Sequence, residues 1–203
     1  MDHAYRRAGR SMTHVADRIR ESAAVLAAMA GDAALCDAVE RAVDLVVGSL
    51  RAGGKLLLCG NGGSAADAQH WAGELVSRFH YDRPGLAAVA LTTDTSILTG
   101  IGNDYGYERL FARQVEALGR PGDVLFALST SGRSPNILAA LRAAREIGLR
   151  SVGFTRGAGG DMEALCDVTL RVPSESTPRI QEGHEVLGHI ICAMVESAMF
   201  PRP

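Results

Sequence analysis

The chain has 203 residues, of which 47% are hydrophobic and 22% charged, and its formal net charge is −2 at pH 7. These values are typical of a globular α/β protein with enough apolar side chains for a core. They come without a Lys/Arg block that could bind a phosphate backbone, which excludes nucleic acid as a partner. We find neither a signal peptide nor a run of about 18 apolar residues, so we expect no membrane partner.

The first 52 residues are predicted to form a pair of helices. Apolar side chains recur at helical spacing between 14 and 27 and again between 35 and 50, and two glycines end the second helix. From residue 53 onward, short apolar runs alternate with helical stretches. The runs are 55–59, 86–91, 124–128, 151–154 and 168–172, and the helical stretches are 65–80, 107–118, 135–147 and 160–165. A long final helix is expected from 178 to 200.

This alternation predicts an α/β fold in which a doubly wound five-stranded parallel sheet is flanked by helices. We interpret residues 1–203 as a single domain, with N-terminal helices over 1–52 and an α/β core and C-terminal helix over 53–203. The four cysteines form no CxxC pair, which favours buried, reduced thiols in the cytoplasm. Ligands of open parallel sheets bind beyond the carboxyl ends of the strands, so we expect function in the loops that follow them.

Two of these loops have the composition of a phosphate site. The first contains Asn61, Gly62, Gly63 and Ser64, where glycine backbone can approach a ligand and Ser64 is the expected N-cap of the next helix. The hydroxyl-bearing residues of the second loop are Ser129, Thr130, Ser131 and Ser134. Ser134 followed by proline is predicted to cap a helix, and hydroxyls beside a helix N-terminus can bind a phosphate dianion. For either loop alone, an ordinary βα turn remains an alternative.

A dinucleotide site is the main alternative for the first loop. Gly60, Gly62 and Ala65 fit the loose glycine fingerprint, and Asp94 follows the second strand as a candidate ribose ligand. Asp94 comes later than the roughly 20-residue spacing that the ribose contact prefers. This interpretation also leaves the second loop without a role.

Two helices carry candidate metal ligands and acid/base groups. His70 and Glu74 are four residues apart on the helix after the first loop, so they share one face, although such a pair is more typical of a solvated surface. The last helix adds the polar residues Gln181, Glu182, His184, Glu185 and His189 to an otherwise apolar run. His189 is expected to face a buried surface, where a core histidine is the simpler interpretation.

Four segments together resemble the bacterial sedoheptulose 7-phosphate isomerases of the SIS-domain family. The segments are 59–64, 102–106, 129–132 and 179–184, and the resemblance extends from the N-terminal helices to the last helix. It implies a cytoplasmic homotetramer of five-stranded parallel α/β domains. It also implies an aldose–ketose isomerase that converts sedoheptulose 7-phosphate to D-glycero-D-manno-heptose 7-phosphate through an enediol(ate), for surface polysaccharide synthesis.

The resemblance assigns roles to individual residues. It implies one zinc ion per subunit, held at His70, Glu74, Gln181 and His189, with the acid/base steps at Glu74 and His189. The substrate-binding residues that it implies are Asn61, Gly62, Gly63, Ser64, Glu74, Asn103, Asp104, Ser129, Thr130, Ser131, Ser134 and Gln181. If Gln181 and His189 lie in one straight helix, they are ~12 Å apart along its axis. We therefore expect a neighbouring subunit to supply part of each site.

Two functions remain as alternatives. Some relatives of this family are regulators that bind the replication initiator protein, and these lack an acidic residue at the position of Glu74. The presence of Glu74 favours an enzyme. The second alternative is an isomerase of another sugar phosphate, because such enzymes share the hydroxyl-rich loop.

Overall fold

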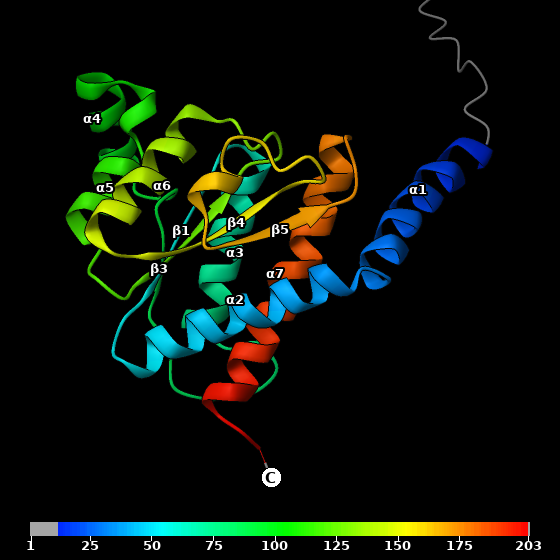
Figure 1. Ribbon diagram of the computed structural model, residues 1–203, viewed down its shortest axis with the longest axis horizontal. Coiled ribbons are helices and arrows are strands. Elements are labelled where there is room, and N and C mark those ends of the chain that lie inside the picture. Colours follow the sequence, from blue (N-terminus) through cyan, green and yellow to red (C-terminus); the bar gives the residue numbers. More distant parts are fainter. Residues whose placement is uncertain (1–11, 203) are drawn as a thin grey trace, which may run out of the picture.

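The structure is a computed structural model that describes residues 12–202 (Figure 1). Within these residues, five parallel strands form one sheet in the order β2-β1-β3-β4-β5. The strands are β1 (Leu56–Gly60), β2 (Ala88–Ala90), β3 (Val124–Leu128), β4 (Arg150–Arg156) and β5 (Val168–Val172). The predicted doubly wound parallel sheet is therefore confirmed. The strand order reverses between β1 and β3, which is where ligands of such sheets bind.

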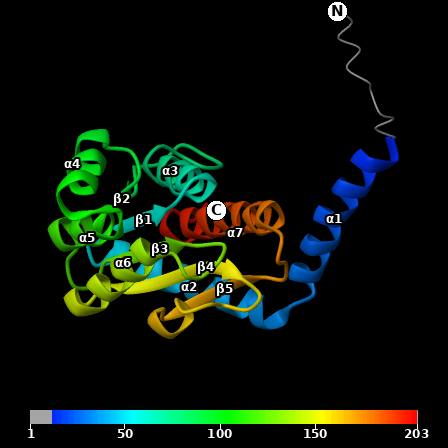
Figure 2. The ribbon, with the colours of Figure 1, turned by 90° about the horizontal axis from the view of Figure 1, so that it is seen from above.

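Helices cover both faces of this sheet. Those described are α1 (Met12–Ala30), α2 (Ala33–Arg51), α3 (Gly63–Val76), α4 (Thr95–Tyr105), α5 (Ala112–Leu118), α6 (Pro135–Ile147) and α7 (Thr177–Met199). Successive strand residues point to opposite faces, so Leu56 and Leu58 pack with α2, α3 and α7, whereas Leu57 and Cys59 pack with α5 and α6. The N-terminal pair and the long last helix are confirmed. Figure 2 shows α1 extending away from the sheet.

Four local corrections to the sequence-based prediction are needed. Helix α4 was not predicted, because two glycines interrupt its short apolar pattern of Ile97, Leu98 and Ile101. None of its side chains is fully buried, although Leu98 and Ile101 pack against the core. The stretch 107–118 is not one helix but a 3₁₀ turn, Tyr107–Arg109, followed by α5. The stretch 160–165 forms only the 3₁₀ turn Glu163–Leu165. Of the cysteines, Cys36 is exposed rather than buried.

Among the described residues, no single helix combines the length and apolar composition needed to cross a bilayer. The pair 14–30 and 33–51 reaches that composition only jointly, with a bend of 75° between its helices.

Helices α3 and α7 lie side by side over β1 and β4, and two features hold them there. Gly188 of α7 packs against Trp71 of α3, and a β-carbon at 188 would overlap the indole ring. Beyond the end of α3, buried Arg83 pairs with buried Glu196 of α7, with Nε 3.0 Å from Oε1. Arg83 also donates to the carbonyl oxygens of Glu74 and Leu75. The last turn of α3 is thus fixed to α7.

Candidate active site

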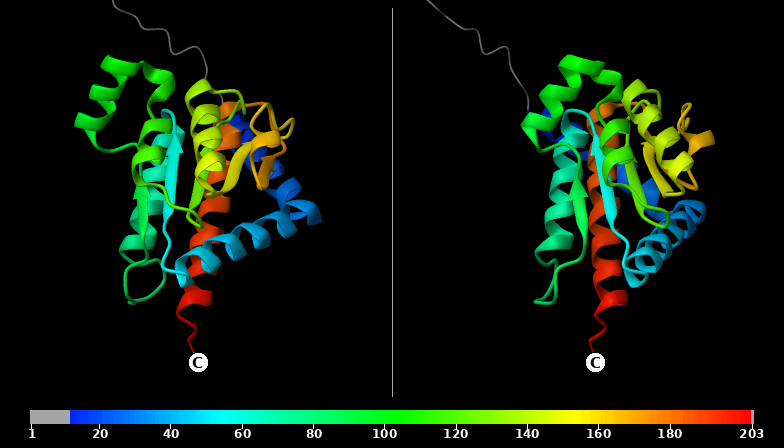
Figure 3. Two further views of the ribbon diagram at one scale, coloured as in Figure 1. Left: turned by 60° about the vertical axis from the view of Figure 1, so that its left-hand side comes forward. Right: turned by 90° about the vertical axis from the view of Figure 1, so that its left-hand side faces the viewer.

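The two loops that the sequence identifies begin next to each other. Gly60 at the end of β1 pairs with Leu128 at the end of β3. Both loops therefore leave the sheet at the point where the strand order reverses. Figure 3 shows that α4 covers this same end of the molecule.

The first loop brings its backbone close to α7. Helix α3 begins at Gly63, after Gly62 has turned the chain with a φ of 58°. Ser64 lies inside the first helical turn and is buried, so the prediction that it caps the helix is wrong. The positive φ, which favours glycine, lets the helix start before Ser64 can act as a cap. A β-carbon at Gly63 would lie 2.5 Å from Nε2 of Gln181, which places the Gln181 amide against this loop.

The second loop, Ser129–Ser134, gathers its hydroxyl groups and is called the hydroxyl loop below. The Oγ of Ser129 lies 3.0 Å from that of Ser134 and 3.4 Å from that of Ser131. Ser134 is the N-cap residue of α6 and Pro135 its first residue, as predicted. These hydroxyls stand at the N-terminus of a 13-residue helix, where free N–H groups and the helix dipole favour an anion.

An amide pair links the two loops. Asn61 Nδ2 donates to Asn136 Oδ1 at 2.9 Å, and Asn136 Nδ2 donates back to Asn61 Oδ1 at 2.8 Å. The hydroxyl of Tyr107 also donates to Asn61 Oδ1, at 3.0 Å. Neither Asn136 nor Tyr107 was identified from the sequence, because an amide pair between residues 75 positions apart leaves no local pattern.

The two remaining substrate candidates, Asn103 and Asp104, lie on α4. Both are exposed, and Asn103 Nδ2 donates to Asp104 Oδ1 at 2.7 Å. They stand on the helix that covers the loop end of the sheet, and Tyr107, which follows this helix, bonds to Asn61.

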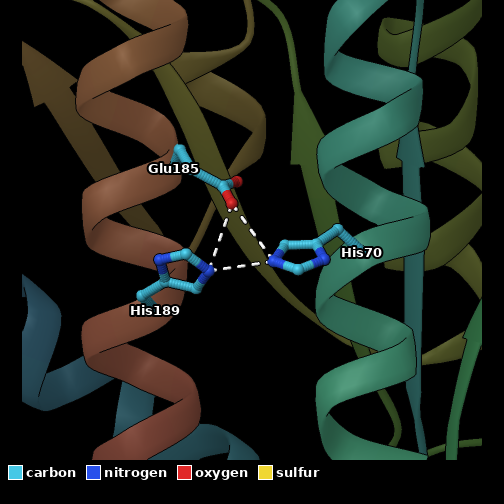
Figure 4. A group of neighbouring side chains, drawn as sticks. All are labelled: His70, Glu185 and His189. Carbon is cyan, nitrogen blue, oxygen red and sulfur yellow. Dashed lines mark hydrogen bonds and ion pairs between the residues drawn. The ribbon is translucent and has the colours of Figure 1, made fainter.

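Farther along α3 and α7, His70, His189 and Glu185 come together (Figure 4), and Glu74 lies beside His70. The Nε2 atoms of His70 and His189 are 2.9 Å apart. Oε1 of Glu185 lies 3.3 Å from the first nitrogen and 3.1 Å from the second. Oε1 of Glu74 lies 3.5 Å from His70 Nε2. These four residues are called the His/Glu cluster below. Three of them, His70, Glu185 and His189, bring together the nitrogen and oxygen ligands that divalent metals bind.

The cluster has excess negative charge and an unsatisfied carboxylate beside it. Asp67, one turn before His70, has a pKa raised to about 6, first by burial and then by the negative charge of Glu185, while His70 opposes the shift. Its buried Oδ2 has no hydrogen-bond partner in the described part of the chain. A cation would offset both, so these residues fit a metal ion.

Comparison with known proteins finds relatives of one family. The SIS domain model matches residues 19–156. A phosphoheptose isomerase from Burkholderia pseudomallei is 61% identical over 94% of this chain and 97% of its own length. Solved phosphoheptose isomerases from Neisseria gonorrhoeae and Francisella tularensis superpose with TM-scores of 0.86 and 0.88, at 45% and 36% identity. They cover 91% and 93% of this chain and 98% and 100% of their own.

The chain belongs to the phosphoheptose isomerase family. In this family member, three of the four expected zinc ligands, His70, Glu74 and His189, lie together within one chain. The fourth, Gln181, lies apart from them against the first loop, as the helix geometry indicates. Glu185 takes part in the cluster instead, although the resemblance gave it no role.

Proposed function

We propose that this chain is an aldose–ketose isomerase that converts sedoheptulose 7-phosphate to D-glycero-D-manno-heptose 7-phosphate. The observation that carries the proposal is the hydroxyl loop and the His/Glu cluster on one scaffold, in a chain 61% identical to a phosphoheptose isomerase. A ketose phosphate needs both parts: a site for a phosphate that does not react, and groups that move a proton between carbons.

The phosphate end of the substrate is assigned to the hydroxyl loop. Ser129, Thr130, Ser131 and Ser134 would donate to its oxygens, together with the N–H groups at the start of α6. The first loop and Asn103 and Asp104 on α4 would contact the sugar hydroxyls. Closely spaced donors at a helix N-terminus stabilise a dianion without a lysine.

Proton transfer is assigned to Glu74 and His189. The reaction removes a proton from carbon and returns one to the neighbouring carbon, through an enediol(ate). One carboxylate and one imidazole on facing helices supply a base and an acid for these two steps. Glu74 lines an open pocket together with Ala66, His70 and Arg78, so a substrate can reach it.

We also propose one zinc ion per subunit, held by residues of the set His70, Glu74, Gln181 and His189. A bound zinc ion polarises carbonyl and hydroxyl oxygens and stabilises developing negative charge on them. The proposal extends to a cytoplasmic homotetramer whose product supplies heptose for surface polysaccharide. Membership of the family supports these proposals. Exposed apolar residues on α7, Val186, Ile190 and Met194, support the association of subunits.

The decisive experiment is an assay with sedoheptulose 7-phosphate that detects the aldose product. We expect turnover by the purified protein, its loss after chelation, and its recovery with Zn²⁺. The same assay with other ketose phosphates tests the alternative substrate. Binding of sugar phosphate without any turnover would contradict the enzyme and favour the regulator.

A further inference from the structure

The loop that follows β4 packs directly against the hydroxyl loop. It comprises residues 157–160 and is called the glycine loop below. A β-carbon at Gly160 would lie 2.8 Å from the carbonyl oxygens of Gly132 and Ser131. One at Gly132 would overlap the carbonyl oxygen of Gly159. Two backbones can approach this closely only where both lack side chains.

Hydrogen bonds hold this contact on both sides. The N–H of Met162, just beyond the glycine loop, donates to the carbonyl oxygen of Gly132 at 3.0 Å. Buried Thr155, near the end of β4, donates from Oγ1 to the carbonyl oxygen of Gly159 at 3.2 Å. The glycine loop is thus bonded both to the strand that it leaves and to the hydroxyl loop.

Helix α7 reaches the same contact through His184. This side chain is fully buried, and its Nε2 lies 3.2 Å from the carbonyl oxygen of Thr155. A carbonyl oxygen only accepts, so Nε2 is the nitrogen that donates. His184 lies between Gln181 and His189 on α7. The helix that carries these two candidate site residues is therefore connected to the hydroxyl loop through Thr155 and the glycine loop.

We propose that Gly160, Thr155 and His184 are positioning residues for phosphate binding. The inference rests on the phosphate site of the proposed function. The three residues fix the backbone of the hydroxyl loop against β4 and α7, so that its hydroxyls and the N–H groups at the start of α6 are directed at one anion. A loop that is fixed before the substrate arrives loses less conformational entropy when it binds the phosphate.

Gly160→Ala tests this positioning by separating KM from kcat. The added β-carbon would displace the hydroxyl loop, so KM for sedoheptulose 7-phosphate should rise ~10–100-fold, as when one hydrogen bond to a charged group is lost. The value of kcat should stay within ~3-fold, because the groups assigned to proton transfer lie on α3 and α7. The dissociation constant of inorganic phosphate, measured by phosphorus NMR titration without turnover, should rise as KM does.

Two further alanine substitutions are matched controls. Gly157 lies in the same loop, but its β-carbon would meet the nearest atom at 3.7 Å, an ordinary contact. Gly122, before β3 at the opposite end of the sheet, has a φ of 89°, similar to the 72° of Gly160. Among the described residues, no atom would lie within 4 Å of a β-carbon at Gly122. Gly122→Ala thus reproduces the backbone strain without the contact, and both controls should keep KM within ~2-fold.

Isosteric changes at Thr155 provide a second test, which applies even if Gly160→Ala does not fold. Thr155→Val removes the hydrogen bond to Gly159 and should raise KM ~3–10-fold, whereas Thr155→Ser keeps the hydroxyl and should not. His184→Leu and His184→Gln form a corresponding pair, because the glutamine amide can still donate to the Thr155 carbonyl. Circular dichroism melting verifies that each variant is folded.

The outcomes separate this inference from the proposed function. Unaltered phosphate affinity in both Gly160→Ala and Thr155→Val, or an equal loss of affinity in Gly122→Ala, would overturn the inference and leave the isomerase assignment intact. If the unchanged protein binds phosphate but shows no turnover, the proposed function is wrong, and the phosphate affinities of the variants still decide the inference. A protein that binds no inorganic phosphate would overturn both.

Discussion

At the residue scale, Glu74 and His189 are the side chains on which proton transfer should depend. We expect Glu74→Gln and His189→Gln each to lower kcat by ~10²–10⁴-fold, the usual contribution of one general acid or base. Neither side chain is in the core, so the melting temperature should hardly change. Kinetics with sedoheptulose 7-phosphate, together with thermal melting, measure both quantities. Near-normal turnover by either variant would remove that residue from the mechanism.

The cluster also shows which residues a sequence can identify. His70 and Glu74 are recognisable because four-residue spacing on a helix forms a pair whatever the tertiary structure. Glu185 and His189 have the same spacing on α7. What the sequence could not show is that Trp71 of another helix, in the space left at Gly188, bonds to Glu185. A pattern within one helix contains no information about a contact that only packing creates.

At the element scale, the Asn61–Asn136 pair joins the first loop to α6. We expect Asn136→Ala to raise KM for the sugar phosphate and to change kcat little, because it would release Asn61 from its binding position without touching the reacting carbons. Loss of the two side-chain hydrogen bonds between these amides should also lower the free energy of unfolding by ~1–3 kcal/mol.

Tyr107→Phe is the matched control for that experiment. It removes one exposed hydrogen bond to Asn61 and leaves the amide pair intact, so its KM should rise less. An unchanged KM in Asn136→Ala would show that the pair does not position the substrate loop.

The Arg83–Glu196 pair joins the end of α3 to α7. Arg83→Met would leave the buried Glu196 carboxylate with only its hydrogen bonds from the Phe79 and His80 amides. We expect the free energy of unfolding to fall by ~3–5 kcal/mol, as when one partner of a buried ion pair is lost. Chemical denaturation measures this. Arg142→Met, an exposed change on α6, should cost far less, and an equal loss in the two variants would contradict the prediction.

The helices and strands that pack against the core were predictable from the sequence. Four of the five strands and helices α2, α3, α6 and α7 bury continuous or periodic apolar residues, which is the signal that sequence reasoning uses. Strand β2 and helix α1 are largely exposed. Helix α4 buries no side chain fully, and besides its caps, Asp94 and Gly106, only a short apolar pattern broken by two glycines marked it. Ser64 was assigned to the wrong position because the backbone turn at Gly62 decides where α3 begins.

At the scale of the whole molecule, the placement of the site within chains can be tested by mixing subunits. Glu74, His70 and His189 meet within one chain. If subunits share the site, as the sequence predicts, the neighbouring subunit must supply other residues than these three. Co-expressed Glu74→Gln and His189→Gln chains should therefore stay inactive, since every cluster carries one lesion. Activity recovered in purified mixed oligomers would instead show that Glu74 and His189 of one site come from different chains.

The exposed position of α4 has a consequence for the dynamics of the whole chain. Local opening requires little energy where few side chains are buried. The backbone amides of 95–105 should therefore exchange with deuterium well before those of β1, β3 and β4, whose side chains are almost entirely buried. A sugar phosphate that contacts Asn103 and Asp104 should hold α4 in its folded state and so oppose its local opening. Bound substrate should therefore slow deuterium exchange at the backbone amides of α4. Mass spectrometry with and without substrate would measure that protection directly.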